Sequence, residues 1–241
     1  VQEYLRSNIC LLEKMIESNY EDSKSILRRI NDMKNWLKKP SLIQPDKNAQ
    51  YEEIIEIDLA KVRQPIVACP NDPDNVKEIA DIANTNIDEV FIGSCMTNIG
   101  HYRAAAKVLE GVQNLKAKLW ICPPTKMDEE TLKAEGYYKI FENCGARIEL
   151  PGCSLCMGNQ ARVDEGSVVF STSTRNFDNR LGKNAQVFLG SAELASVCAL
   201  LGKIPEVEEY QDITKNKINP YSDELYRYLQ FDEIHDFSLS K

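Results

Sequence analysis

The chain has 241 residues, with 29 Lys and Arg against 37 Asp and Glu, which gives a formal net charge of -8. Hydrophobic residues make up 43% of the chain, enough to bury a core, so the composition excludes a disordered or collagen-like protein. The acidic charge argues against a broad phosphate-binding surface, and any bound anion must therefore be held by a few local cations.

The N-terminal region, over about residues 1–39, is predicted to form two helices. In the second, Ile26, Ile30, Met33 and Leu37 recur at steps of three and four residues, as on one face of an amphipathic helix. Residues 40–50 contain two prolines and several polar residues, so they are predicted to be a linker. We therefore expect a helical segment and linker over residues 1–50 and an α/β domain over residues 51–241.

From residue 51 onward, short apolar runs alternate with helical stretches, a pattern typical of a parallel sheet flanked by helices. The predicted strands cover residues 54–57, 66–69, 89–93, 119–122, 147–150, 168–171 and 187–189. The predicted helices cover about residues 74–83, 99–112, 128–141 and 192–201. In the tail, Tyr221, Tyr226, Tyr228 and Phe231 are expected to pack onto the body. The expected fold is a three-layer αβα domain with a mostly parallel sheet, preceded by the two-helix segment.

Two further features bear on the cellular compartment. No apolar run reaches the roughly 18 residues needed to span a membrane, and no charged-then-apolar leader opens the chain. The eight cysteines lie in a Lys- and Glu-rich chain too long to need disulfides, which favours reduced thiols or metal ligands. We expect a soluble, cytoplasmic protein without a membrane partner. The first residue is Val1 rather than Met, from which we expect that further chain precedes it.

Reactive side chains follow three of the predicted strands. Cys95 follows residues 89–93, Cys153 and Cys156 follow residues 147–150, and Arg175 and Arg180 follow residues 168–171. In an open parallel sheet, ligands bind beyond the carboxyl ends of the strands. If these strands run parallel, the five side chains are expected to lie at one edge of the sheet.

The cysteines allow more than one interpretation. Cys153 and Cys156 form a Cys-x-x-Cys loop, which can bind a metal, exchange disulfides or hold two corners of an iron-sulfur cluster. Cys95 adds a third thiol, and three thiolates on a four-iron cluster leave one iron without a protein ligand. Such an iron is a Lewis acid that can polarise a C–O bond without redox chemistry. A zinc-stabilised structural domain, with Cys122 as a fourth ligand, is the alternative.

The two arginines lie among hydroxyl and amide side chains. A planar guanidinium binds a carboxylate in bidentate fashion, so Arg175 and Arg180 fit a polycarboxylate ligand. The alternative is a solvated loop in which these arginines pair with Asp178 or Glu165.

Three stretches of sequence carry a specific resemblance. They are GSCMTNIGH at residues 93–101, PGCSLCMGNQ at residues 151–160 and STSTRNFDNR at residues 171–180. These stretches resemble the cluster and substrate loops of the aconitase family, and the likeness extends over nearly the whole chain. It implies an aconitate hydratase of the tricarboxylic acid cycle, a hydro-lyase that interconverts citrate and isocitrate through cis-aconitate. Related enzymes of this branch also hydrate 2-methyl-cis-aconitate.

The resemblance also implies roles for particular residues. By matching positions, Cys95, Cys153 and Cys156 would bind a [4Fe-4S] cluster, and Arg175 and Arg180 would bind carboxylates of the tricarboxylate substrate. The family's serine base lies in domains that precede this segment, so no catalytic residue is assigned here. Those N-terminal domains are expected partners, and this segment alone should be catalytically incomplete.

The family also suggests a second function and shows two departures in this sequence. Relatives without their cluster bind messenger RNA, which gives a regulatory RNA-binding module as the alternative. Thr174 stands where many members have Asn, and Asn179 where many have Gly. His101 follows the first cluster loop and is expected to be a packing or helix-surface residue.

Overall fold

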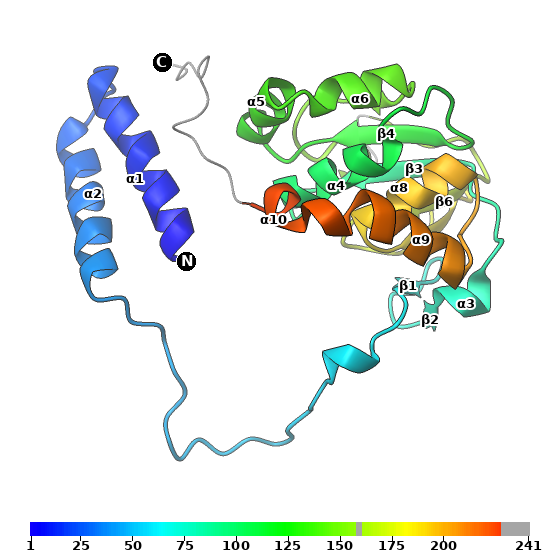
Figure 1. Cartoon of the computed structure of the whole chain (residues 1–241), viewed down its shortest axis with the longest axis horizontal. Coiled ribbons are helices and arrows are strands. Elements are labelled where there is room, and N and C mark those ends of the chain that lie inside the picture. The colour runs from blue at the N-terminus through cyan, green and yellow to red at the C-terminus, as the bar shows by residue number, and fades with distance from the viewer. Residues whose placement is uncertain (158–160, 228–241) are drawn as a thin grey trace. The chain divides into compact units, whose positions relative to one another are not determined.

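The computed structural model describes residues 1–157 and 161–227 of the chain. These residues form two compact units, one over residues 1–62 and the other over residues 63–227 (Figure 1). The domain boundary predicted at residue 50 stays a prediction, because residues 40–58 are a connecting stretch without helix or strand. Tyr228 and Phe231, predicted to pack onto the body, lie outside the described residues.

The N-terminal unit contains a pair of packed helices, α1 (Gln2–Glu17) and α2 (Ser23–Lys38), which confirms the two predicted helices. Their shared core is formed by Ile9, Ile26 and Ile30. α2 begins where the Asp22 carboxylate accepts a hydrogen bond from the Ser25 amide at 3.2 Å. A short 3-10 helix, η1 (Leu59–Lys61), lies near the end of this unit.

The strand predicted at residues 54–57 is wrong. These residues form neither helix nor strand, and Ile54, Ile55 and Ile57 are 77%, 76% and 72% exposed. A strand is stabilised by backbone pairing and by packing of one face. Within the described residues this run has no pairing strand, so its apolar side chains alone do not make it extended structure.

The second unit is built on a seven-stranded sheet in the order β2-β1-β7-β6-β3-β4-β5. The strands are β1 (Ile66–Ala68), β2 (Val76–Glu78), β3 (Glu89–Gly93), β4 (Lys118–Cys122), β5 (Arg147–Ile148), β6 (Val168–Ser171) and β7 (Gln186–Leu189). The last five strands run parallel to one another, whereas β1 pairs with both β2 and β7 in antiparallel fashion. The predicted α/β class with a mostly parallel sheet is therefore confirmed.

The helix predicted at residues 74–83 is mostly wrong. Residues 76–78 form β2, and only the single turn α3 (Ile79–Ile82) is helical. The β1–β2 hairpin closes where the Cys69 amide donates to the Asn75 carbonyl at 2.8 Å, and Asn71 in the turn has a φ of 65°. Asparagine tolerates this left-handed conformation and so reverses the chain. The apolar spacing that suggested a helix arises from a strand followed by one helical turn.

Helices cover one face of the parallel strands. α4 (Ile99–Leu109) packs against α8 (Ala192–Leu201), α8 contacts β3 and β6, and α9 (Val207–Lys217) packs on α4 and α8 (Figure 1). The opposite face packs against α7 (Ser154–Met157) and against residues from 161 onward. There the strand residues Phe91, Trp120, Val169 and Val187 pack with Leu155, Val163 and Leu181.

Local signals explain where the helices begin and end. The Asn98 side chain accepts a hydrogen bond from the Gly100 amide at 2.9 Å at the start of α4. Ser191 starts α8 in the same way, so the helices predicted at residues 99–112 and 192–201 are confirmed. The single helix predicted at residues 128–141 instead divides into α5 (Lys126–Ala134) and α6 (Tyr137–Asn143), because Gly136 between them has a φ of 84°.

The chain then runs through η2 (Asn219–Tyr221) and α10 (Ser222–Leu225). α10 contacts α4, and Tyr226 lies beside His101 with their ring centroids 6.0 Å apart, so the expected packing of this tail residue is confirmed. Within the described residues, no helix has the length and apolar character needed to cross a membrane.

Candidate metal and substrate site

The loop after β3 carries Cys95, which is exposed. The preceding residue, Ser94, is buried and has a φ of 148°, a conformation that residues with a side chain rarely adopt. Its hydroxyl accepts a hydrogen bond from the Met96 amide at 3.2 Å and lies 3.2 Å from the Thr97 hydroxyl. These contacts hold the loop in a sharp turn that leaves the Cys95 thiol accessible.

Thr172 joins this loop to the loop that follows β6. Its hydroxyl accepts a hydrogen bond from the Gly93 amide at 2.9 Å and donates one to the Gly93 carbonyl at 2.8 Å. Because β3 and β6 are parallel neighbours, both loops leave the sheet at the same edge. The cysteine loop and the arginine loop are therefore adjacent at their bases.

The Cys-x-x-Cys loop follows β5 at that edge, with Cys153 exposed and Cys156 buried. Gly152 has a φ of 135°, and no atom lies within 4 Å of the position that a Cβ would take there. Cys122, at the end of β4, places its sulfur 3.2 Å from the Leu150 carbonyl oxygen and 3.3 Å from that of Gly152. Cys122 therefore supports this loop through the loop's own backbone.

The two arginines have different surroundings. Arg180 is 8% exposed, and its Nη2 donates to the Cys156 sulfur at 3.0 Å and also to the Cys156 carbonyl. The Nε of Arg180 is buried and has no hydrogen-bond partner among the described residues. Arg175 is exposed and forms no hydrogen bond or ion pair with the residues that the structure describes. Glu165, the suggested alternative partner, instead pairs with Lys183 at 2.7 Å.

The five predicted site residues therefore follow parallel strands at one edge of the sheet, and Arg180 is in direct contact with Cys156. None of the eight cysteines, all of which lie in the described part of the chain, forms a disulfide. In residues 1–157 and 161–227, however, no three His, Cys, Asp or Glu side chains lie close enough together to hold a metal ion. Residues 158–160, which complete the predicted cluster loop, lie outside the described part.

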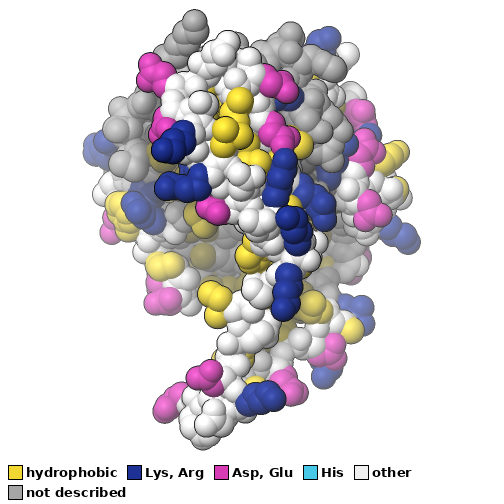
Figure 2. Space-filling view, turned by 90° about the vertical axis from the view of Figure 1, so that its left-hand side faces the viewer, with side chains coloured by type: hydrophobic (Ala, Val, Ile, Leu, Met, Phe, Trp, Pro, Cys, Tyr) yellow, Lys and Arg dark blue, Asp and Glu magenta, His cyan; other side chains and the backbone are white. Residues whose placement is uncertain are grey.

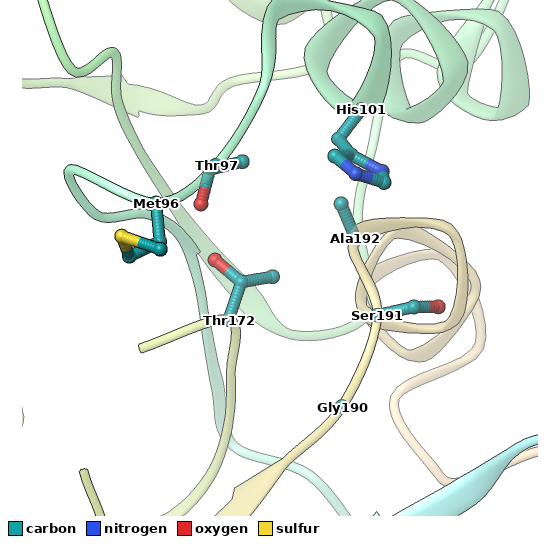
Figure 3. A pocket seen from close by; sticks show the side chains of 7 residues that line it. All are labelled: Met96, Thr97, His101, Thr172, Gly190, Ser191 and Ala192. Carbon is teal, nitrogen blue, oxygen red and sulfur yellow. The ribbon is translucent and has the colours of Figure 1, made fainter. Parts of the chain in front are cut away.

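A pocket of about 150 Å³ lies beside the Cys95 loop. Seven residues line it: Met96, Thr97, His101, Thr172, Gly190, Ser191 and Ala192 (Figure 3). His101, expected from the sequence to be a packing or helix-surface residue, has a side chain that is 41% exposed and that lines this pocket. No local motif marks His101, since its hydrogen-bonding partner Glu193 is distant in the sequence.

His101 and Glu193 influence each other's ionisation. His101 Nδ1 lies 3.0 Å from Glu193 Oε1, and this hydrogen bond raises the pKa of His101 above its ordinary value, against the opposing effect of burial. Burial would raise the pKa of Glu193, but hydrogen bonds from His101 and Tyr226 outweigh it and lower that pKa to about 2. Glu193 is therefore a carboxylate at neutral pH, with a cation or a donor facing it.

Known proteins resemble this chain over most of its length. The model of the aconitase family (aconitate hydratase) matches residues 19–202. Aconitate hydratase B of Synechocystis is 62% identical over 237 residues, which cover 98% of this chain and 27% of the relative. Aconitate hydratase B of Helicobacter pylori is 54% identical over 244 residues, which cover 98% of this chain and 29% of the relative.

A more distant relative is the methanogen homoaconitase large subunit of Methanocaldococcus jannaschii, which is 39% identical over 172 residues, covering 70% of this chain and 41% of that subunit. The chain thus spans 27% and 29% of the length of the two aconitate hydratases B that it matches. Since the family model covers most of its sequence, this chain belongs to the aconitase family.

Proposed function

We propose that this chain is the cluster-binding part of an aconitate hydratase, a hydro-lyase that interconverts citrate and isocitrate through cis-aconitate and also acts on 2-methylisocitrate. Membership of the aconitase family and the identity to aconitate hydratases B support this class of reaction. The observation that carries the proposal is the contact between Arg180 and Cys156, because it joins a candidate carboxylate-binding cation to a candidate cluster ligand.

Cys95, Cys153 and Cys156 would hold a [4Fe-4S] cluster. The chemistry of the donor set fits this group, because three free thiols follow parallel strands at one edge and open space surrounds Gly152 beside them. When bound through three thiolates, such a cluster supplies a Lewis acid at its remaining iron, which polarises the C–O bond of a hydroxy acid.

Arg175 and Arg180 would bind the carboxylates of the tricarboxylate. Buried polar groups in folded proteins are nearly always paired, so the unpaired Nε of Arg180 supports an anionic partner that the chain itself does not provide. The exposed Arg175 would offer a second guanidinium from the same loop. The base and the other substrate-binding groups would come from further domains of a longer chain, in the reducing cytoplasm.

The two alternatives lack a supporting observation among the described residues. A zinc site that uses Cys122 is disfavoured because that thiol is buried against the Leu150 and Gly152 carbonyls. An RNA-binding surface would need clustered cations. On the face drawn in Figure 2, some Lys and Arg side chains lie next to one another, but Asp and Glu side chains lie around them, and the net charge of the whole chain is -8.

Anaerobic reconstitution of the chain with iron and sulfide tests the proposal. We expect a brown protein with about four irons per chain. Replacing Cys95, Cys153 or Cys156 by Ser, one at a time, should abolish the stable four-iron form. Cys10→Ser is the matched control, because Cys10 lies in the N-terminal unit and should leave iron binding unchanged. A colourless product, or zinc as the bound metal, would refute the proposal.

A further inference from the structure

The pocket beside Cys95 is assembled from three of the loops at the carboxyl ends of the parallel strands. Met96 and Thr97 come from the loop after β3, Thr172 from the loop after β6, and Gly190 and Ser191 from the loop after β7. His101 of α4 and Ala192 of α8 face each other on one side of this space, with Thr97 and Thr172 on the other (Figure 3). The pocket therefore lies between the loops that carry Cys95 and the two arginines.

The orientation of the His101 ring is set by two partners. Nδ1 points to Glu193 Oε1 at 3.0 Å, and the Tyr226 hydroxyl donates to the same oxygen at 2.6 Å. The rings of His101 and Tyr226 meet edge to face at an interplanar angle of 74°. With Nδ1 committed to Glu193, Nε2 is the nitrogen available to a ligand, and it has no hydrogen-bond partner in the described part of the chain.

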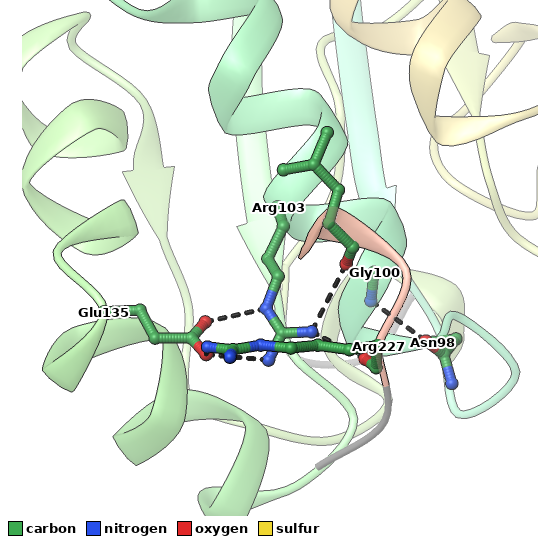
Figure 4. Close-up of polar contacts among 6 residues, drawn as sticks. Asn98, Gly100, Arg103, Glu135 and Arg227 are labelled. Carbon is green, nitrogen blue, oxygen red and sulfur yellow. Dashed lines mark hydrogen bonds and ion pairs between the residues drawn. The ribbon is translucent and has the colours of Figure 1, made fainter. Parts of the chain in front are cut away.

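Tyr226 is itself held by a buried ion-pair cluster, which Figure 4 shows. The Arg103 guanidinium, 2% exposed, donates to both oxygens of Glu135 at 2.7 and 2.8 Å. It also donates to the Leu225 carbonyl at 3.3 Å and to the Arg227 carbonyl at 2.7 Å. The backbone on both sides of Tyr226 is thus fixed to α4 by Arg103, two residues after His101.

This arrangement is typical of a side chain that acts on a ligand. A carboxylate that accepts a hydrogen bond from Nδ1 fixes the ring and directs Nε2 at the pocket, where Nε2 is a donor when the imidazole is protonated and an acceptor when it is neutral. Glu193 is 9% exposed and is paired to both His101 and Tyr226, so a buried negative charge lies next to the His101 imidazole. A histidine with only a structural role at a helix surface needs neither a buried carboxylate beside it nor an unpaired nitrogen that faces a pocket.

We propose that His101 is a further substrate-binding residue of this site, whose protonated imidazole donates a hydrogen bond from Nε2 to a carboxylate of the tricarboxylate in the pocket. Glu193 and Tyr226 are positioning residues, because they contact His101 and are not among the residues that line the pocket. The inference rests on the proposed function for the identity of the ligand. It extends the binding site beyond the two arginines to the first turn of α4.

Nuclear magnetic resonance of the histidines tests this inference on the cluster-free chain. The sequence has only two histidines, so a His235→Gln variant leaves the imidazole signals of His101 alone. We expect titration with propane-1,2,3-tricarboxylate to shift these signals to saturation. Sodium chloride at equal ionic strength should not reproduce the shift. Signals that stay still, or that follow ionic strength alone, would overturn the inference.

Variants separate binding from folding. Measured by calorimetry, His101→Gln should bind the tricarboxylate about tenfold more weakly, as expected for loss of one charge-assisted hydrogen bond. Tyr226→Phe keeps the ring but frees the Glu193 oxygen, and it should alter the His101 signals while the backbone spectrum stays folded. Unchanged affinity in a folded His101→Gln chain would overturn the inference.

Iron binding distinguishes this inference from the proposed function. If the chain binds four irons but the His101 signals do not respond to the tricarboxylate, the inference about His101 is refuted and the proposed function stands. If the His101 signals respond to the tricarboxylate but the chain binds no iron, the proposed function is refuted and the role of His101 in binding stands.

Discussion

Arg180 donates a hydrogen bond from Nη2 to the sulfur of Cys156 at 3.0 Å, and both side chains are buried. The same nitrogen contacts the Cys156 carbonyl. The guanidinium therefore ties the arginine loop to the Cys-x-x-Cys loop through main chain and side chain together. Its positive charge would also offset negative charge on a sulfur that binds iron.

Replacing Arg180 by Gln should therefore affect stability as well as ligand binding. The change leaves the buried Cys156 carbonyl without its partner, so we expect the free energy of unfolding to fall by about 1–3 kcal/mol. Urea denaturation followed by circular dichroism measures this loss.

Arg175→Gln is the matched control on the same loop. Arg175 is exposed and has no partner among the described residues, so its removal should change stability by no more than about 0.5 kcal/mol. Both variants should still lose tricarboxylate binding if both arginines bind the substrate. Equal stability losses in the two variants would contradict the assigned difference in their surroundings.

A second prediction concerns the Arg103–Glu135 pair. Glu135→Ala leaves the nearly fully buried Arg103 guanidinium without its carboxylate, which should destabilise the chain by about 3–5 kcal/mol. Chemical denaturation measures this effect. Glu165→Ala breaks a pair whose side chains are 58% and 70% exposed, and it should cost no more than about 1 kcal/mol. Similar costs for both variants would show that burial does not determine the strength of the Arg103 pair.

The His101–Glu193 pair predicts a particular pH dependence. The pKa of His101 is raised above 6.5, so the stabilisation from its protonation is fully present below pH 6.5 and is lost as the pH rises through the raised pKa. The pKa of Glu193 falls from 4.5 to about 2, so its contribution is present above pH 4.5 and is lost as the pH falls toward 2.

Thermal unfolding between pH 5 and 9 tests the predicted contribution of His101 protonation to stability. In the His235→Gln background, the difference in Tm between His101 and His101→Gln chains should be largest at about pH 5–6 and should shrink at higher pH. A difference that stays constant over this range would mean that protonation of His101 does not contribute.

Much of this fold can be predicted from the sequence because its signals are local. The apolar runs at β3, β4 and β6 lie where strands form, and Asn98 and Ser191 begin helices as capping residues do. The same reasoning failed at Val76, where apolar spacing is shared by a helix and by a strand followed by one turn. Only the pairing of Val76 with Ala68 in the sheet decides between them.

In the candidate site too, some residues could be predicted from local sequence and others could not. Cys95, Cys153 and Arg180 could be picked out because each follows a recognisable strand in a characteristic motif. The partnership of His101 with Glu193 could not, because it joins α4 to α8 across a wide gap in sequence and depends on Tyr226 arriving from a third element. Contacts of this kind depend on tertiary packing, for which a single sequence carries no local pattern.

Gly100 provides a final test of how closely the chain after α10 must approach α4. A Cβ at this position would lie 2.9 Å from Tyr226 Cδ1, 3.0 Å from Tyr226 Cα and 3.1 Å from the Leu225 carbonyl oxygen. In an open helix, replacing Gly by Ala stabilises by about 1 kcal/mol. Here the Cβ meets backbone, so we expect Gly100→Ala to destabilise by about 1–3 kcal/mol and to shift the His101 imidazole signals.

Gly136→Ala shows what backbone conformation alone costs. Gly136 has a φ of 84°, and no atom lies within 4 Å of a Cβ built there. Ala at this position should therefore destabilise by about 1–2 kcal/mol through strain, without moving the His101 signals. If Gly100→Ala also left those signals in place, the close approach of Tyr226 would not be what orients His101. The orientation of the His101 ring would then depend on Glu193 alone. The ion pair of Arg103 would serve only to hold residues 225–227 against α4.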